Sequence, residues 1–222
     1  MVGRISKRSR NLELIPSRRI MNRVSQLNPF QASGKTASLF GVVKRRTGAA
    51  ANVDRVLGNS PAVLRGFLSL NQALSSGVLS AKLREQIALA VSEINVCAHC
   101  LSAHSLAGKR AGLSAAEISA ARFGTGSGEK AEAVLDLVWA IVSEKGQIDN
   151  LDIQAARKAG FSDEEIVEVV ANIALTLITN YVNHVARMVI DFPEVIPGVV
   201  SDDALLGALL SNSRPQTIHG YV

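Results

Sequence analysis

Helical periodicity dominates this sequence and limits the folds that it can adopt. From residue 33 onward, apolar residues recur three and four positions apart, and no useful stretch alternates apolar and polar residues as a strand does. The chain holds one Trp, two Tyr and six Phe, so Ala, Leu, Val and Ile must build its interior. Together these observations predict an all-α fold in which helices pack on helices.

Helix start and stop signals divide this region. Ser114 with Glu117, and Ser162 with Glu165, fit the S/T-x-x-E capping box that opens a helix. Asn95 is a candidate N-cap for the helix that holds both cysteines. We expect helices over 33–43, 62–74 behind Pro61, 81–94 behind Ser80, 96–109, 127–145, a short one from the cap Asn150 to Gly160, and 163–188.

Charge and hydropathy suggest three regions. Residues 1–32 form a basic extension that we expect to be disordered, residues 33–192 a compact helical domain, and residues 193–222 a proline-containing tail that we place in subunit contacts. Of the 24 Lys and Arg residues, eleven lie in residues 1–50 beside one acid, so the net charge of +5 belongs to the N-terminus. The body is mildly acidic, which argues against a nucleic-acid partner.

The most apolar run, residues 166–190, contains polar residues at helical spacing. We interpret it as a buried core helix and expect no membrane partner.

The two cysteines of the chain are separated by two residues, and a histidine follows four residues after the second. Cys97, Cys100 and His104 therefore fall on one face of a helix, where two sulfurs can form and break a disulfide. So few cysteines suit a reducing compartment, and we expect a cytoplasmic protein. Inert buried thiols and a structural metal site are the alternatives, although zinc usually takes four ligands and His99 is badly oriented for the fourth.

The spacing also suggests roles for these side chains. A helix N-terminus stabilises a thiolate, which favours a lowered pKa at Cys97. His104 lies four positions after Cys100, within reach for proton exchange, whereas His99 points elsewhere. Glu85 and Glu93 on the preceding helix compete for the place beside this face.

The pattern from Glu85 to His104, EQIALAVSEINVCAHCLSAH, resembles the alkylhydroperoxidase D-like branch of the carboxymuconolactone decarboxylase superfamily. The phrases NSPAVLRGFL, AGLSAAEI, AGFSDEEIVEVV and NYVNHVAR extend the resemblance over residues 21–192. It implies an all-α fold that assembles into trimers or hexamers. His99 departs from the pattern, because an aromatic residue often stands between the cysteines.

The resemblance further implies a thiol-dependent peroxidase without a bound cofactor. It assigns attack on a hydroperoxide to Cys100, resolution of the sulfenic acid to Cys97, a proton relay to Glu85 and His104, and a further relay position to His99. The reductant would be a lipoamide-like or thioredoxin-like dithiol. A redox sensor that switches partners, and a lactone decarboxylase that does not need the cysteines, remain alternatives.

Overall fold

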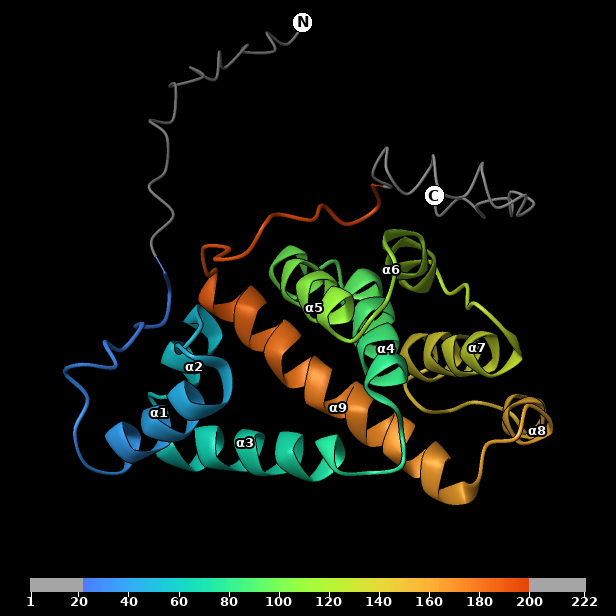
Figure 1. Ribbon diagram of the computed structural model, residues 1–222, viewed down its shortest axis with the longest axis horizontal. Helices are drawn as coiled ribbons and strands as arrows, with labels where there is room; N and C mark the ends of the chain where they lie inside the picture. The colour runs from blue at the N-terminus through green and yellow to red at the C-terminus, as the bar shows by residue number, and fades with distance from the viewer. Residues whose placement is uncertain (1–21, 200–222) are drawn as a thin grey trace, which may run out of the picture.

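The computed structural model describes residues 22–199, and this part of the chain contains nine helices and no strand (Figure 1). The predicted all-α class is confirmed. In order, the helices are α1 (Gly34–Thr47), α2 (Asn52–Leu57), α3 (Pro61–Ser75), α4 (Ala81–Ile94), α5 (Ala98–Arg110), α6 (Ala115–Arg122), α7 (Glu129–Ser143), α8 (Asn150–Lys158) and α9 (Asp163–Ala186).

Helix α4 is the centre of the larger core. It packs against α5, α6, α7 and α9, and it buries side chains on every side over its last two turns. Ile87, Leu89, Ala90 and Val91 are fully buried, together with Val134 and other residues of α7. Small and branched aliphatic side chains therefore fill this core, as the composition predicts.

The long helix α9 runs across the molecule, with α1, α2 and α3 on one side and α4 to α7 on the other (Figure 1). A second, smaller core of Phe40, Leu57 and Leu64 lies on the first side, and Val182 of α9 packs against it. Among the described helices, α9 has the length and apolarity of a membrane span. It nevertheless buries four polar side chains within the protein, namely Asn172, Thr176, Asn180 and Asn183.

Capping explains most of the helix boundaries. Ser114 with Glu117, and Ser162 with Glu165, form the predicted capping boxes of α6 and α9. The predicted cap at Asn150 is wrong by one residue, because the Asp149 carboxylate accepts the first amide hydrogen bonds of α8. The periodicity also missed α2, whose six residues are too few to show a helical repeat.

Parts of both expected terminal regions lie against the helices. The Arg23 amide donates to the Ala186 carbonyl at 2.8 Å, and the Asn59 side chain donates to the Ser25 carbonyl at 2.6 Å. Residues 22–32 therefore lie against the end of α9 and the residues after α2, although they belong to the stretch expected to be disordered. The remainder of the two regions, residues 1–21 and 200–222, lies outside the described part of the chain.

Truncation of Leu89 to Ala is expected to lower the free energy of unfolding by about 2–5 kcal/mol. Leu89 is fully buried in the central helix, so its loss leaves a cavity that the surrounding helices cannot close completely. Denaturant unfolding followed by circular dichroism measures the change. The control Leu151→Ala alters a side chain that is 70% exposed and is expected to shift stability by less than about 0.5 kcal/mol. Equal effects of the two substitutions would contradict this account of the core.

Candidate active site

The turn between α4 and α5 determines where the cysteines lie. Val96 has a positive φ of 54°, in the left-handed region that a β-branched residue rarely adopts. The Val96 amide donates to the Glu93 carbonyl and the Cys97 amide to the Ser92 carbonyl, each at 2.9 Å. These two bonds form a Schellman motif that closes α4.

The predicted N-cap at Asn95 is therefore wrong. Asn95 ends α4, where its side-chain amide donates to the Val91 carbonyl at 2.8 Å, and Cys97 is the N-cap of α5. Val96, in its left-handed conformation, lies between them, so the N-cap of α5 comes two residues later than the capping preference of Asn predicts.

Cys97 and Cys100 are free thiols that belong to the first turn of α5. The Cys97 sulfur takes the place of a capping oxygen and accepts the Cys100 amide, with 3.4 Å between N and Sγ. Both side chains are buried, with exposed fractions of 2% and 3%. The sulfurs are thus held near each other beneath the surface at a helix N-terminus, which stabilises negative charge.

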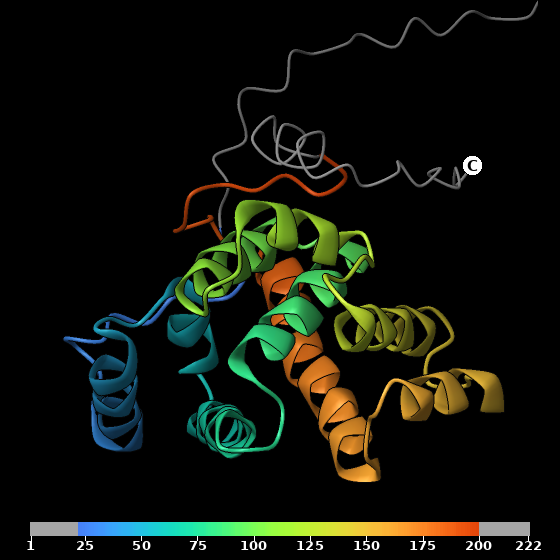
Figure 2. The ribbon, with the colours of Figure 1, turned by 45° about the vertical axis from the view of Figure 1, so that its right-hand side comes forward.

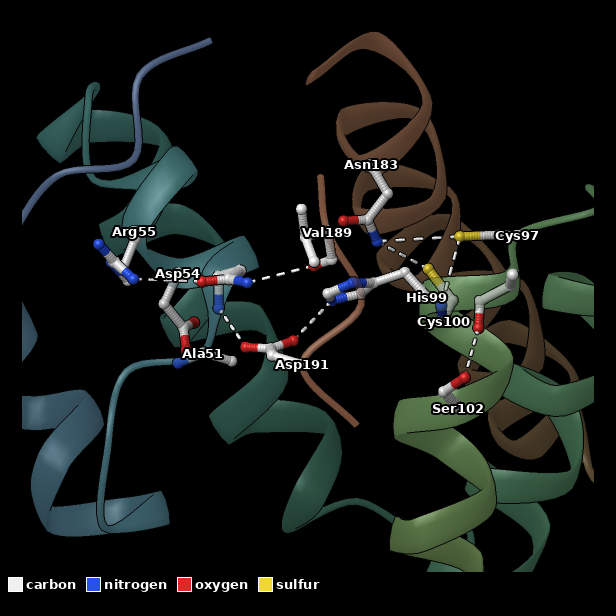
Figure 3. Close-up of polar contacts among 12 residues, drawn as sticks. Ala51, Asp54, Arg55, Cys97, His99, Cys100, Ser102, Asn183, Val189 and Asp191 are labelled. Carbon is white, nitrogen blue, oxygen red and sulfur yellow. Dashed lines mark hydrogen bonds and ion pairs between the residues drawn. The ribbon is translucent and has the colours of Figure 1, made fainter. Parts of the chain in front are cut away.

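Helix α9 supplies amide groups to the same sulfurs. Nδ2 of Asn183 lies 2.9 Å from Sγ of Cys100 and 3.8 Å from Sγ of Cys97 (Figure 3). One turn earlier, Asn180 donates to the Ser92 hydroxyl at 3.4 Å and is fully buried. An amide that donates to sulfur favours the thiolate over the thiol, because the thiolate is the stronger acceptor.

The two thiols have opposite pKa shifts. The hydrogen bond from the Cys100 thiol lowers the pKa of Cys97 from 9.0 to about 7, despite burial, with help from the Cys100 amide, His184 and Asn183. The same hydrogen bond raises the pKa of Cys100, and burial and the charge on Cys97 raise it further. Cys97 is therefore the first of the two thiols to lose its proton, which agrees with the lowered pKa predicted for a cysteine at a helix start.

Glu85 and His104 form an ion pair beside the cysteines. Nδ1 of His104 lies 2.9 Å from Oε2 of Glu85, and both side chains are about one quarter exposed. Burial acts to lower the pKa of His104, but the hydrogen bond and charge of Glu85 outweigh it, so the pKa is raised. The Cys100 sulfur accepts a hydrogen bond from Asn183, and among residues 22–199 no hydrogen bond joins it to His104.

The competing acid, Glu93, has a different partner. Its carboxylate accepts Nε of Arg122 at 2.7 Å, and both side chains are buried. The structure therefore brings Glu85, and not Glu93, to the histidine of the pattern. Glu93 and Arg122 instead hold the chain that follows α9.

We call residues 188–199, which follow α9, the C-terminal strap. In Figure 2 this segment crosses above α5. The Val195 amide donates to the Ser102 hydroxyl at 2.9 Å, and Arg122 donates to the Ile196 carbonyl at 2.8 Å. The Gly198 amide donates to Glu93. The strap is thus fastened to α4, α5 and α6.

His99 faces the strap and not His104. Its Nε2 lies 3.5 Å from Oδ1 of Asp191, and its ring meets Phe192 edge to face at 5.5 Å between centroids (Figure 3). Burial lowers the pKa of His99, while Asp191 opposes the shift. Asp191 also accepts the Asn52 amide of α2 at 2.8 Å, so it joins the site to the first part of the chain.

Two of these polar residues, Asn183 and Asp191, were not singled out from the sequence. A signal for Asn183 was present, since the otherwise apolar stretch of α9 carries asparagines at helical spacing that all turn out to be buried. No sequence pattern indicates a role for Asp191, whose contacts with Asn52 and His99 join segments that are distant in the sequence. Within residues 22–199, no three His, Cys, Asp or Glu side chains are arranged to hold a metal ion.

Comparison with known proteins identifies the sequence segment that carries this site. Residues 61–138 match the model of the carboxymuconolactone decarboxylase family, a span that contains α3 to α6, both cysteines, Glu85 and His104. A search of the curated proteins finds no match to the chain.

Solved structures resemble about three quarters of the chain. A peroxidase-related protein from Ralstonia eutropha JMP134 with an alkylhydroperoxidase AhpD core has a TM-score of 0.69 at 21% identity, over 77% of this chain and 93% of its own. A peroxidase-related protein from Silicibacter sp. TM1040 has a TM-score of 0.62 at 21% identity, over 76% and 93%. The debrominase Bmp8 bound to 2,3,4-tribromopyrrole has a TM-score of 0.65 at 20% identity, over 77% and 94%. At these identities the likeness establishes the fold.

The opposite thiol shifts lead to a test of the cysteine pair. In Cys100→Ala the pKa of Cys97 is expected to rise from about 7 toward 9.0, because its largest stabilising hydrogen bond is lost. The ultraviolet absorbance of the thiolate, followed against pH, measures this midpoint. Ser105→Ala, which alters another buried side chain of α5, is the matched control and should leave the midpoint near 7. An unchanged midpoint in Cys100→Ala would show that Cys100 does not stabilise the Cys97 thiolate.

Proposed function

We propose that this chain is a thiol-dependent peroxidase, because residues 61–138 match the model of the carboxymuconolactone decarboxylase family and the fold is that of a peroxidase-related protein with an alkylhydroperoxidase AhpD core. The observation that carries the proposal is the buried Cys97–Cys100 pair, in which the pKa of Cys97 is lowered to about 7. A thiol that ionises near neutral pH can take part in redox chemistry, and a neighbouring thiol can complete a disulfide.

The proposed cycle uses both sulfurs. The Cys100 proton passes to its neighbour, and the Cys100 thiolate attacks the terminal oxygen of a hydroperoxide. An S–O bond forms, the O–O bond breaks, and the alkoxide takes a proton to leave as an alcohol. Cys97, again as thiolate, attacks the Cys100 sulfenic acid, so that the disulfide forms and water leaves. Two thiols and one hydroperoxide thus give one disulfide, one alcohol and one water.

The surrounding residues support these roles. Asn183 lies nearer to the Cys100 sulfur than to the Cys97 sulfur, which suits a negative charge on Cys100 during attack. The Glu85–His104 pair is the proton source for the leaving alkoxide, because the raised pKa of His104 keeps its imidazole protonated over more of the neutral range. His99 with Asp191 is a second proton-exchanging pair on the strap side.

A dithiol reductant would complete the cycle. Thiolate attack on the disulfide is fastest when the leaving sulfur has the lower pKa, which is Cys97. We propose a lipoamide-like or thioredoxin-like reductant for this step. We also propose a cytoplasmic homo-oligomer, a trimer or a hexamer.

The debrominase among the structural neighbours favours a second candidate reaction at the same thiols. A dithiol can replace the bromine of a bromopyrrole by hydrogen, which yields the disulfide, bromide and a proton. This reaction oxidises two thiols per turnover, as the peroxidase reaction does. Its product distinguishes it, because bromide is released only in debromination.

The peroxidase proposal is tested with reduced protein and one equivalent of tert-butyl hydroperoxide. We expect loss of two thiols per chain in the wild type, a stable sulfenic acid in Cys97→Ser and no reaction in Cys100→Ser. Thiol titration and mass spectrometry measure these outcomes. Sulfenic acid in Cys100→Ser, with an inert Cys97→Ser, would reverse the roles of the two cysteines.

Parallel incubation with 2,3,4-tribromopyrrole separates the candidate reactions. Bromide release together with unchanged hydroperoxide would replace the peroxidase by a debrominase. Conversion of a lactone by the Cys97→Ser, Cys100→Ser double variant would point instead to cysteine-independent decarboxylation. The untreated reduced protein is the control for air oxidation of the thiols.

A further inference from the structure

Asn183 is a core asparagine of which one side-chain end is satisfied and the other is not, as is Asn180 one turn earlier, but the satisfied end of Asn183 lies on the Cys100 sulfur. Asn183 is 6% exposed, and its Nδ2 contacts both sulfurs. Its Oδ1 is buried and has no hydrogen-bond partner among the described residues. Buried amide oxygens are nearly always paired, so an unpaired one beside a reactive group indicates a ligand that it accepts from.

Chemistry fixes which end of the amide faces the cysteines. A thiolate only accepts hydrogen bonds, so the NH2 end must face the sulfurs, which leaves the carbonyl oxygen of the same amide free to accept from another group. Figure 3 shows this arrangement, with the nitrogen of Asn183 directed at Cys97 and Cys100 and the oxygen turned toward Val189 of the strap. Both ring nitrogens of His99 are also buried without a hydrogen bond among the described residues, although Nε2 lies 3.5 Å from the Asp191 carboxylate.

We propose that Asn183 is a catalytic residue that holds both reacting atoms, the Cys100 sulfur through Nδ2 and the terminal oxygen of the hydroperoxide through Oδ1. This inference rests on the peroxidase function proposed above and deepens it. It assigns the substrate-binding contact to α9, a helix outside the segment that matches the family.

The assignment follows from the chemistry of a hydroperoxide. Its terminal oxygen carries the O–H hydrogen, which is the one donor of the R–O–O–H group, and it is also the atom that the thiolate attacks. An amide oxygen that accepts this hydrogen therefore holds the attacked oxygen next to the sulfur bound by the same amide. Reacting atoms held at about 3–3.5 Å gain much of the rate available from orientation.

The electron balance of the step is unchanged by Asn183. The Cys100 thiolate gives an electron pair to the terminal oxygen, the O–O bond breaks, and the pair of that bond leaves on the alkoxide, which takes a proton from the Glu85–His104 pair. The hydrogen on the terminal oxygen stays with it and becomes the hydrogen of the sulfenic acid. Asn183 gains and loses no bond, and its oxygen is a hydrogen-bond acceptor throughout.

The test compares two reagents in a Cys97→Ser background, where Cys100 is the one thiol left. Tert-butyl hydroperoxide needs the thiolate and offers an O–H, whereas methyl methanethiosulfonate needs the thiolate and has no hydrogen-bond donor. Both rate constants are proportional to the fraction of Cys100 that is thiolate, so this fraction cancels when the rate constant for the hydroperoxide is divided by that for methyl methanethiosulfonate. The ratio therefore reports the contact of Oδ1 with the hydroperoxide. The rate with methyl methanethiosulfonate alone reports the Nδ2 contact.

Two substitutions separate the ends of the amide. Asn183→Leu removes donor and acceptor, so we expect a rate with methyl methanethiosulfonate that is about tenfold lower and a ratio that is about five- to tenfold lower. Asn183→Asp removes the donor but keeps an acceptor oxygen, so the rate falls while the ratio stays near that of the parent. Asn172→Leu is the matched control, because Asn172 is equally buried on the same face of α9, three turns away, and its amide donates to Glu168.

The outcomes are distinct. An unchanged ratio in Asn183→Leu overturns the substrate contact, and an unchanged rate with methyl methanethiosulfonate overturns the sulfur contact. If Asn183→Leu does not fold by circular dichroism, Asn183→Ala replaces it in the same comparison. A wild type that consumes hydroperoxide beside an inert Cys97→Ser overturns the proposal together with the role of Cys100. Failure of the wild type itself would mean that the peroxidase function is wrong, whatever Asn183 does with the donor-free reagent.

Discussion

The sulfurs lie where they do because one residue between two helices takes a left-handed backbone conformation. With Val96 in that conformation, α4 closes on the Glu93 and Ser92 carbonyls and α5 can begin at once with Cys97 as its cap. The Cys97 sulfur then accepts the Cys100 amide and lies within reach of α9. The lowered pKa of Cys97 depends on these local contacts, and hence on the bend.

The remainder of the site is built by packing three segments around that bend. Helix α4 contributes Glu85 to His104, α9 contributes Asn183 to the sulfurs, and the strap contributes Asp191 to His99. Each contact joins residues distant in the sequence, and each lies beside the large apolar core. The core thus fixes the positions of groups that α5 alone would leave loosely placed.

Much of the fold could be predicted from the sequence, because periodicity and caps are local. The capping boxes of α6 and α9 are read from four residues each, and the cysteine pair from its spacing. The N-cap predicted at Asn95 is wrong because Val96 takes a left-handed backbone conformation, which the identity of a valine does not predict. The contacts of Asn183 and Asp191 depend on tertiary packing, so a sequence pattern could show their presence but not their partners.

The strap has a further consequence for selectivity among cellular thiols. The strap is fastened to the Glu93–Arg122 pair and to Ser102, and both sulfurs are buried, so the surface of a protein reductant cannot lie directly against the sulfurs. In the proposed cycle, such a reductant would have to bind the protein surface and reach the disulfide on an extended arm. The shape of the strap, as well as the reactivity of the thiols, would then determine which reductant can reduce the disulfide.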